Sequence, residues 1–254
     1  MAIHYYTPEE VKKIREAGRI LARVAKEVLV AAAEGIILRQ LDALARQLIR
    51  KAGAQPAFLG YRPGGAKKPY PAAICTSVNE VVVHGIPSDY ALKPGDLLKL
   101  DFGVIYNGYY ADAAWTVPIG VVSPEAGRLI DVTKKALYKG IAAATTDKTL
   151  GDIGYAVQNC VEKAGFHVIT GLTGHGVGKA LHEDPSVYNF GEIGKGMPLA
   201  AGLVLAIEPM TAIGSGNIVK RPDESYATAD GSLSVHFEHT IAITEHGPVI
   251  LTKE

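Results

Sequence analysis

The chain has 254 residues, and its 26 lysines and arginines balance its 26 aspartates and glutamates. This balance gives neither a nucleic acid nor an anionic membrane an electrostatic reason to be the principal partner. The two cysteines, Cys75 and Cys160, lie outside any metal-binding spacing, which is typical of a reduced cytoplasmic protein. The start lacks an apolar signal segment, and no run of about 18 apolar residues occurs. We therefore expect a soluble, cytoplasmic protein.

The predicted elements begin with a helix. Thr7, Pro8 and Glu10 suit the N-cap, first and third positions of a capped helix, which we expect over about 8–33. A second helix is expected over about 39–52, followed by a loop over 57–71. The other expected elements are strands at 72–76 and 80–83, a hairpin at 97–115, helices at about 124–145 and 150–164, and strands at 167–170, 203–207, 226–228, 235–244 and 249–251. This mixture predicts an α+β fold.

The hairpin is the most informative of these segments. Asn107-Gly108 best tolerates the positive φ angles of a two-residue turn, and β-prone residues flank it on both sides. With that turn Gly103 faces Asp112, and Asp101 lies on the same face two residues further along its strand. Two buried carboxylates without compensation would be costly, so we expect a positive group between them.

Two short alignments indicate a duplication. Leu41 to Gly53 aligns without gaps on Ile153 to Gly165, and Gly95 to Asp101 aligns on Gly202 to Glu208. Each half thus contains a strand that ends in an acid, and folding the halves together would bring the acids to a shared centre. We predict one catalytic domain over 1–254, with an N-terminal helix at about 8–33 and half-repeats at about 37–122 and 123–254.

Further acids and a histidine lie in apolar or glycine-rich surroundings. Glu208 ends an apolar strand, Glu238 lies in an alternating segment, and His175 has a glycine on each side. Together with Asp101 and Asp112 they form a set of four carboxylates and one imidazole. Such hard ligands suit Mn(II), Fe(II), Co(II) or Zn(II), and the surplus of negative charge favours two ions over one.

Other catalytic motifs fit poorly. The glycines around His175 do not follow a first strand and open a long helix, as a dinucleotide loop would. His182-Glu183 has no second histidine at the spacing of a zinc-protease helix, and no GxSxG motif occurs. His84, considered alone, is interpreted as a hydrogen-bonded core histidine.

The local sequences around these residues resemble those of type I methionine aminopeptidase, a family with the pita-bread fold. The matching contexts are LDFGVIYNGYYADAAW, GHGVGKALHEDP, AIEPM, FEHT and NEVVVHGIP. The resemblance spans essentially the whole chain. The absence of a large N-terminal domain, of a long insertion before the last strands and of a zinc-binding extension favours the short prokaryotic form. The resemblance implies two pseudo-symmetric halves with a central antiparallel sheet backed by helices.

The resemblance also implies a site. Two divalent metal ions would be held by Asp101, Asp112, His175, Glu208 and Glu238, of which Asp112 and Glu238 would bridge the ions. Glu208 would also handle the proton of a bridging water, which makes it catalytic.

Substrate contacts follow from the same resemblance. His84 and His182 match two catalytic histidines that contact the substrate around the scissile amide. Tyr61, Tyr70 and Cys75 match positions that line the pocket for the methionine side chain.

The implied activity is removal of the initiator methionine from nascent proteins and peptides with a small second residue. We expect a monomer that associates transiently with the ribosome and binds neither a specific nucleic acid nor a membrane.

Three departures from the family pattern leave alternatives open. Phe58 stands where a cysteine is common, Leu181 where an aromatic is common, and Glu224 to Tyr226 where a tryptophan is often found; the loop 62–69 is longer than usual. An aminopeptidase with an altered first-residue preference is therefore one alternative. A non-catalytic peptide-binding member of the fold is the other.

Overall fold

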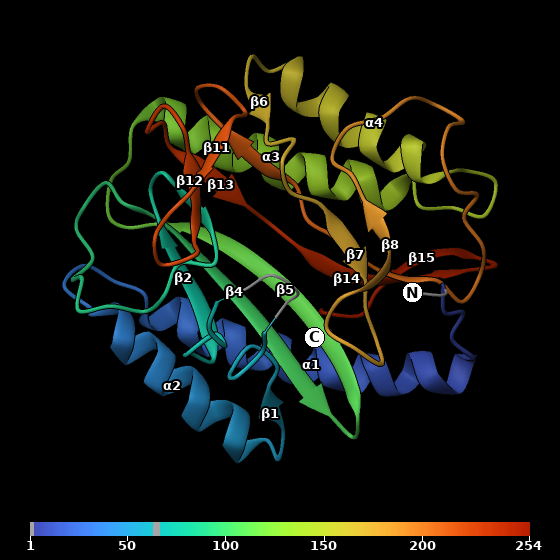
Figure 1. Cartoon of the computed structure of the whole chain (residues 1–254), viewed down its shortest axis with the longest axis horizontal. Helices are drawn as coiled ribbons and strands as arrows, with labels where there is room; N and C mark the ends of the chain where they lie inside the picture. The colour runs from blue at the N-terminus through green and yellow to red at the C-terminus, as the bar shows by residue number, and fades with distance from the viewer. Residues whose placement is uncertain (1–2, 63–66) are drawn as a thin grey trace.

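A computed structural model of the chain describes residues 3–62 and 67–254 (Figure 1). The four predicted helices are present. They are α1 (Pro8–Ala31), α2 (Leu38–Lys51), α3 (Pro124–Ala142) and α4 (Leu150–Glu162). As predicted, the Thr7 side chain accepts from the Glu10 backbone and Glu10 caps the Thr7 N–H, while Pro8 occupies the first turn. The lengthened part of loop 62–69 lies largely outside the described residues.

The strands form four sheets within the described residues. The first contains β1 (Gln55–Pro56), β2 (Ile74–Val78), β4 (Leu97–Tyr106) and β5 (Tyr109–Pro118). The second contains β7 (Gly174–Gly176), β8 (Glu183–Val187), β9 (Val204–Ile207), β14 (His239–Thr244) and β15 (Gly247–Ile250). Two small sheets contain β3 (Val81–Val83), β11 (Ile218–Lys220) and β12 (Tyr226–Thr228), and β6 (His167–Val168), β10 (Met210–Ala212) and β13 (Ser234–His236).

The predicted hairpin is confirmed residue by residue. Tyr106 pairs with Tyr109, and Gly103 pairs with Asp112. Asn107 and Gly108 form the turn with φ angles of 50° and 77°, the left-handed conformation that favours these two residue types.

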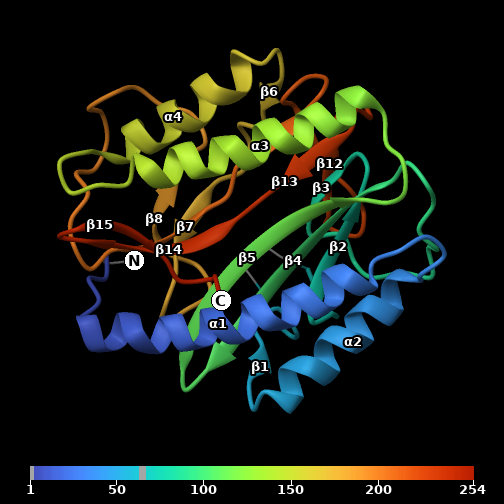
Figure 2. The same cartoon turned by 180° about the vertical axis from the view of Figure 1, so that it is seen from behind.

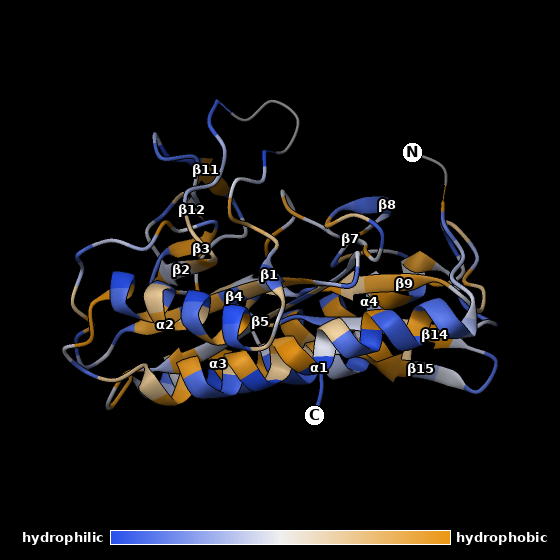
Figure 3. Cartoon of the chain, turned by 90° about the horizontal axis from the view of Figure 1, so that it is seen from below, coloured by the Kyte–Doolittle hydropathy of each residue, from blue (hydrophilic) through white to orange (hydrophobic). Residues whose placement is uncertain are grey.

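The helices cover one side of the two larger sheets (Figure 2). Seen from the edge, the helices lie below the long strands, while β3, β8, β11 and β12 lie with the loops above them (Figure 3). One apolar cluster joins α1 and α2 to β4 and β5, and a second joins α3 and α4 to β9, β13 and β14. Trp115 packs against both clusters. The open side of the sheets is thus left for polar residues. Within the described residues, no helix is both long and apolar enough to span a bilayer.

One predicted strand is divided. Residues 235–244 form β13 and β14, which belong to different sheets, with Phe237 and Glu238 between them. The Glu238 N–H donates to the Ala114 carbonyl on β5 over 2.9 Å, so the chain bends where it changes partners. Alternation along the sequence shows which face a residue takes but not which strand it pairs with, and it therefore could not predict the break. The short strands β1, β7, β8, β10 and β11 were not predicted either, because their pairing is set by distant partners.

The first half, over about 37–122, contains α2 and the two longest strands, β4 and β5, while the second half contains α3, α4 and shorter strands. The division into half-repeats at about 37–122 and 123–254 within one domain stays a prediction.

Candidate metal centre and active site

Five predicted side chains converge between the two large sheets. Within the described residues, ligand atoms of His175, Glu208 and Glu238 lie within 4.8 Å of one another, as do those of Asp101, Asp112 and Glu238. Glu238 belongs to both groups. The His175 Nε2 atom lies 3.5 Å from Glu208 Oε1 and 3.8 Å from Asp112 Oδ2. The structure therefore brings together all five residues that the sequence singled out.

Hydrogen bonds from residues distant in the sequence hold the backbones of two of these acids. The Asp112 N–H donates to the Thr240 hydroxyl over 3.0 Å, and that hydroxyl donates back to the Asp112 carbonyl over 2.7 Å. Asn189 Nδ2 donates to the Glu208 carbonyl over 2.9 Å. These contacts hold the backbone at Asp112 and at Glu208, so the placing of these two acids depends on residues far away in the sequence.

The acids are largely buried, and several of their carboxylate oxygens lack a hydrogen-bond partner. Asp112 and Glu238 are almost fully buried, and Asp101 Oδ1, Asp112 Oδ1 and Glu238 Oε1 have no hydrogen-bond partner. Burial raises the pKa of Asp101 to about 7 despite the nearby His236, and it raises the pKa of Glu208 to about 7 despite His175. Burial, and then the neighbouring carboxylates, place the pKa values of Asp112 and Glu238 well above their ordinary range.

Lys99 does not supply the missing positive charge. Its side chain is fully buried, but its ammonium donates to the backbone carbonyls of Asn79, over 2.6 Å, and Ser234, over 3.2 Å. Partnerless carboxylate oxygens beside an imidazole form a donor set that suits divalent cations. His175 fits this role, because its Nδ1 lies 2.9 Å from the Gly176 carbonyl and leaves Nε2 facing the acids. The residues present therefore fit a divalent metal centre.

His182 adjoins this cluster. Its ring centroid lies 4.3 Å from that of His175, and its Nδ1 is 2.6 Å from the Tyr61 hydroxyl. Burial, and then His84, lowers the pKa of His182 to about 4. His182 is therefore a neutral imidazole near neutral pH, and the contact with Tyr61 fixes the orientation of its ring.

His84 follows β3 with a positive φ of 62°. Burial is the main cause that lowers the pKa of His84 to about 4, although the residue keeps exposed surface. Its ring contacts Tyr226 edge-on at 5.8 Å between centroids. The interpretation of His84 as a core histidine is wrong, because the ring is not enclosed.

The predicted pocket residues form one small cluster. Cys75, Phe58 and Leu181 are buried together with Ala57, and Tyr61 and Tyr70 pack against them. Cys75 pairs with Asp101 across β2 and β4, which places the cluster beside the acids. The Tyr70 hydroxyl donates to the Gly85 carbonyl over 2.8 Å, and its ring lies edge-on to that of Phe58.

His236 also lies at the site, although the sequence did not predict it there. This residue is 1% exposed, its two ring nitrogens have no hydrogen-bond partner, and its Nε2 lies 3.4 Å from Glu208 Oε2. The signal was present, because His236 precedes Glu238 by two residues and alternation places both on one face. Proximity to Asp101 partly offsets the burial that lowers the pKa of His236 to about 4.

Comparisons with known proteins agree with this geometry. The model of metallopeptidase family M24 matches residues 12–245. A methionine aminopeptidase of Aquifex aeolicus is 47% identical over 257 residues and covers 100% of both chains. Methionine aminopeptidase 1 of Bacillus subtilis is 44% identical and covers 97% of this chain and 98% of its own. The crystal structure of a methionine aminopeptidase from Thermotoga maritima has a TM-score of 0.95 at 41% identity, with 100% of each chain covered. These matches confirm the resemblance and the pita-bread fold, and the chain belongs to metallopeptidase family M24.

Proposed function

We propose that the chain is a metal-dependent aminopeptidase that removes the N-terminal methionine from peptides and nascent proteins with a small second residue. The observation that carries the proposal is the gathering of three buried carboxylates, the partly buried Asp101 and His175 beside His182 in a chain of this family. Full-length relatives that are named methionine aminopeptidases support the choice of substrate.

The metal centre would be held by the five converging residues. Asp101, Asp112 and Glu238 would form one group of ligands, and His175, Glu208 and Glu238 the other, which supports two divalent ions rather than one. The ions, when bound, would polarise the scissile carbonyl and lower the pKa of the attacking water. The ion used in the cell would depend on which of Mn, Fe, Co and Zn is available.

The protein's own groups would handle the protons and orient the amide. Glu208 would take the proton of the water at a carboxylate oxygen and return it to the leaving amine. His182 would donate a hydrogen bond to the oxygen that gains negative charge, and His84 would contact the scissile nitrogen. The contact between His182 Nδ1 and Tyr61 leaves Nε2 available for this bond.

The methionine side chain would enter the cluster of Phe58, Cys75 and Leu181 between Tyr61 and Tyr70. The departures at Phe58 and Leu181 support the second candidate, an aminopeptidase with a different first-residue preference. Tripeptides beginning with Met, Leu or Pro separate the two candidates. The cytoplasmic location, the monomeric state and the transient contact with the ribosome stay predictions.

The experiment that tests the proposal measures free methionine released by metal-stripped protein. Met-Ala-Ser and Met-Leu-Ser are offered while Mn(II), Fe(II) or Co(II) is titrated. We expect metal-dependent release from Met-Ala-Ser and little from Met-Leu-Ser. A folded protein that releases no methionine with any of these metals would favour a non-catalytic peptide-binding protein.

A further inference from the structure

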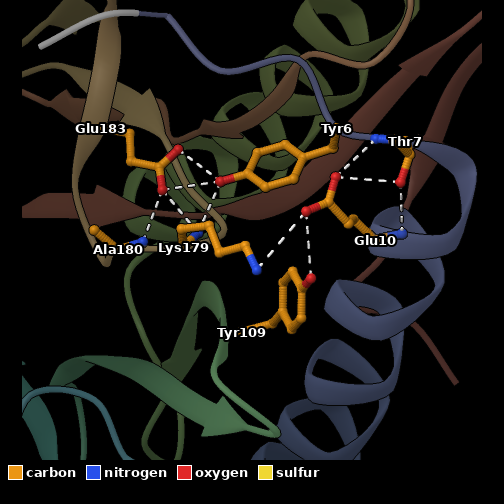
Figure 4. A network of polar contacts seen from close by, with 7 residues as sticks. All are labelled: Tyr6, Thr7, Glu10, Tyr109, Lys179, Ala180 and Glu183. Carbon is orange, nitrogen blue, oxygen red and sulfur yellow. Dashed lines mark hydrogen bonds and ion pairs between the residues drawn. The ribbon is translucent and has the colours of Figure 1, made fainter.

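A network of polar contacts ties the segment before α1 to the loop that ends at His182 (Figure 4). The Tyr6 hydroxyl donates to both carboxylate oxygens of Glu183, over 2.9 and 2.8 Å. The Lys179 N–H donates to the Tyr6 oxygen and to Glu183 Oε1, each over 2.7 Å, and the Ala180 N–H donates to Glu183 Oε1 over 2.7 Å. No metal ligand takes part in this network.

Tyr6 is firmly anchored. Its ring is 4% exposed and packs in a cluster with Val177 and Val204. Its N–H donates to the Gly202 carbonyl over 2.7 Å. Burial, and then the bond to Glu183, places the pKa of Tyr6 well above its ordinary value, so the hydroxyl remains a donor at every pH of interest.

The backbone of the loop is shaped around this ring. Gly178 has a φ of 155°, and a Cβ atom on it would collide with the Tyr6 ring and hydroxyl. Only a glycine therefore allows the loop to pass over Tyr6 this closely. The Gly178 carbonyl accepts from the Tyr110 N–H over 2.8 Å, which binds the other side of the loop to the β4–β5 hairpin.

A second set of contacts lies nearer the solvent. The Lys179 ammonium is 3.7 Å from Glu10 Oε1 and 3.9 Å from the centre of the Tyr109 ring, and the Tyr109 hydroxyl donates to Glu10 over 3.3 Å. Glu10 is also the acid that caps α1. The Lys179–Glu10 ion pair is partly exposed and such pairs contribute little, so the Tyr6–Glu183 pair carries most of the constraint.

The position of this loop matters for the site. It connects β7, which carries His175, to β8, which begins at Glu183 directly after His182. Gly176 pairs with Glu183 at the base of the loop. Any shift of the Glu183 backbone therefore moves the imidazole of His182, whose only hydrogen bond among the described residues is to Tyr61.

We infer that Tyr6 is a positioning residue that holds His182 in its catalytic place through the carboxylate of Glu183. This inference rests on the proposed function, because it assigns His182 to the scissile amide. Tyr6 thereby contributes to the active site, although its hydroxyl makes no hydrogen bond to a proposed metal ligand among the described residues.

The test is a comparison of Tyr6→Phe with the matched control Tyr5→Phe. Tyr6→Phe keeps the buried ring and removes only the hydroxyl, while Tyr5 is 51% exposed. We expect kcat for Met-Ala-Ser to fall about tenfold in Tyr6→Phe, with KM and Mn(II) affinity unchanged, because small displacements of a catalytic group reduce rate strongly. Tyr5→Phe should match the wild type. Unchanged kcat in Tyr6→Phe overturns the inference.

A double-mutant cycle separates positioning from general stabilisation. In a His182→Ala background, Tyr6→Phe should have no further effect on kcat, because the group that it positions is gone. An equal fall in both backgrounds would show that Tyr6 acts elsewhere, and the inference would be wrong.

A readout without catalysis keeps the inference apart from the proposed function. The ring resonances of His182 and the amide exchange of Lys179 and Ala180 are measured by NMR in wild type and Tyr6→Phe. We expect a shifted His182 signal and faster exchange. If the wild type releases no methionine, the proposed function fails, while the NMR result still decides whether Tyr6 fixes His182; unchanged spectra overturn the inference.

Discussion

The two sides of the candidate site respond to burial in opposite ways. On the acid side, burial raises the pKa values of Asp101 and Glu208 to about 7. On the histidine side, burial lowers those of His84 and His182 to about 4. Burial disfavours the charged form in each case, so both sides tend towards neutrality when no cation is present.

This difference shows what each side is suited for. A bound cation can replace the protons of the acids and restore their charge, which is the behaviour of metal ligands. The neutral imidazole of His182 needs no such exchange, and it can bond to a substrate whether or not its neighbours are charged. The acid side is therefore expected to govern metal binding and the histidine side to govern substrate turnover.

The largest effect is expected from removing Glu238, because this residue belongs to both groups of proposed metal ligands. Glu238→Ala should reduce methionine release to background and the number of Mn(II) ions bound, because the remaining acids cannot hold both ions. Calorimetric titration and the Met-Ala-Ser assay measure the two effects. Glu245→Ala, at an exposed position beyond β14, is the control. Full turnover by Glu238→Ala in metal-controlled buffer would refute the two-ion proposal.

The histidine side should affect turnover alone. We expect His182→Ala to lower kcat by about 10²–10³-fold, the usual loss when one donor to a developing charge is removed. Its Mn(II) affinity should stay at the wild-type value. The exposed His246 supplies the control variant His246→Ala. Loss of metal binding in His182→Ala would place this residue on the acid side instead.

His236 contacts the acid side without being a proposed metal ligand. Since its Nε2 is 3.4 Å from Glu208 Oε2, it can orient a ligand without binding the ion. We expect His236→Leu to weaken Mn(II) binding by about 10–100-fold, as removal of a ligand's outer partner does. His236→Gln keeps a donor and should lose less. Equal losses in the two variants would mean that the polar contact with Glu208 is unimportant.

The smallest expected effect is on the pH dependence of stability. Asp101 and Glu208 have folded pKa values of about 7, above the unfolded values of about 4, so the metal-free fold loses stability as pH rises through about 7. The buried histidines act in the opposite direction, but only below their unfolded pKa of about 6.5.

Bound metal removes the penalty on the acids. The increase in Tm on adding Mn(II) should therefore grow by a few degrees between about pH 6.5 and 8. Scanning calorimetry of both forms measures this difference. An increase that does not change with pH would contradict the raised carboxyl pKa values.

Much of the site could be predicted because its acids are charged residues in apolar segments of the sequence. Asp101 and Asp112 lie in strands that are otherwise apolar, and the Asn107-Gly108 turn fixes their register by local rules alone. Glu208 and Glu238 were found by the same contrast. His236 escaped attention because a histidine beside a predicted ligand reads as an ordinary core residue.

The helices, the hairpin and the five candidate ligands could be predicted from the sequence, since capping, turn chemistry and alternation act over a few residues. The division of residues 235–244 between two sheets and the exposure of His84 to solvent are seen only in the folded chain. Only the tertiary structure brings Tyr6 to Glu183, which are 177 positions apart. Such contacts depend on how distant elements pack together, and no local pattern in the chain records that packing.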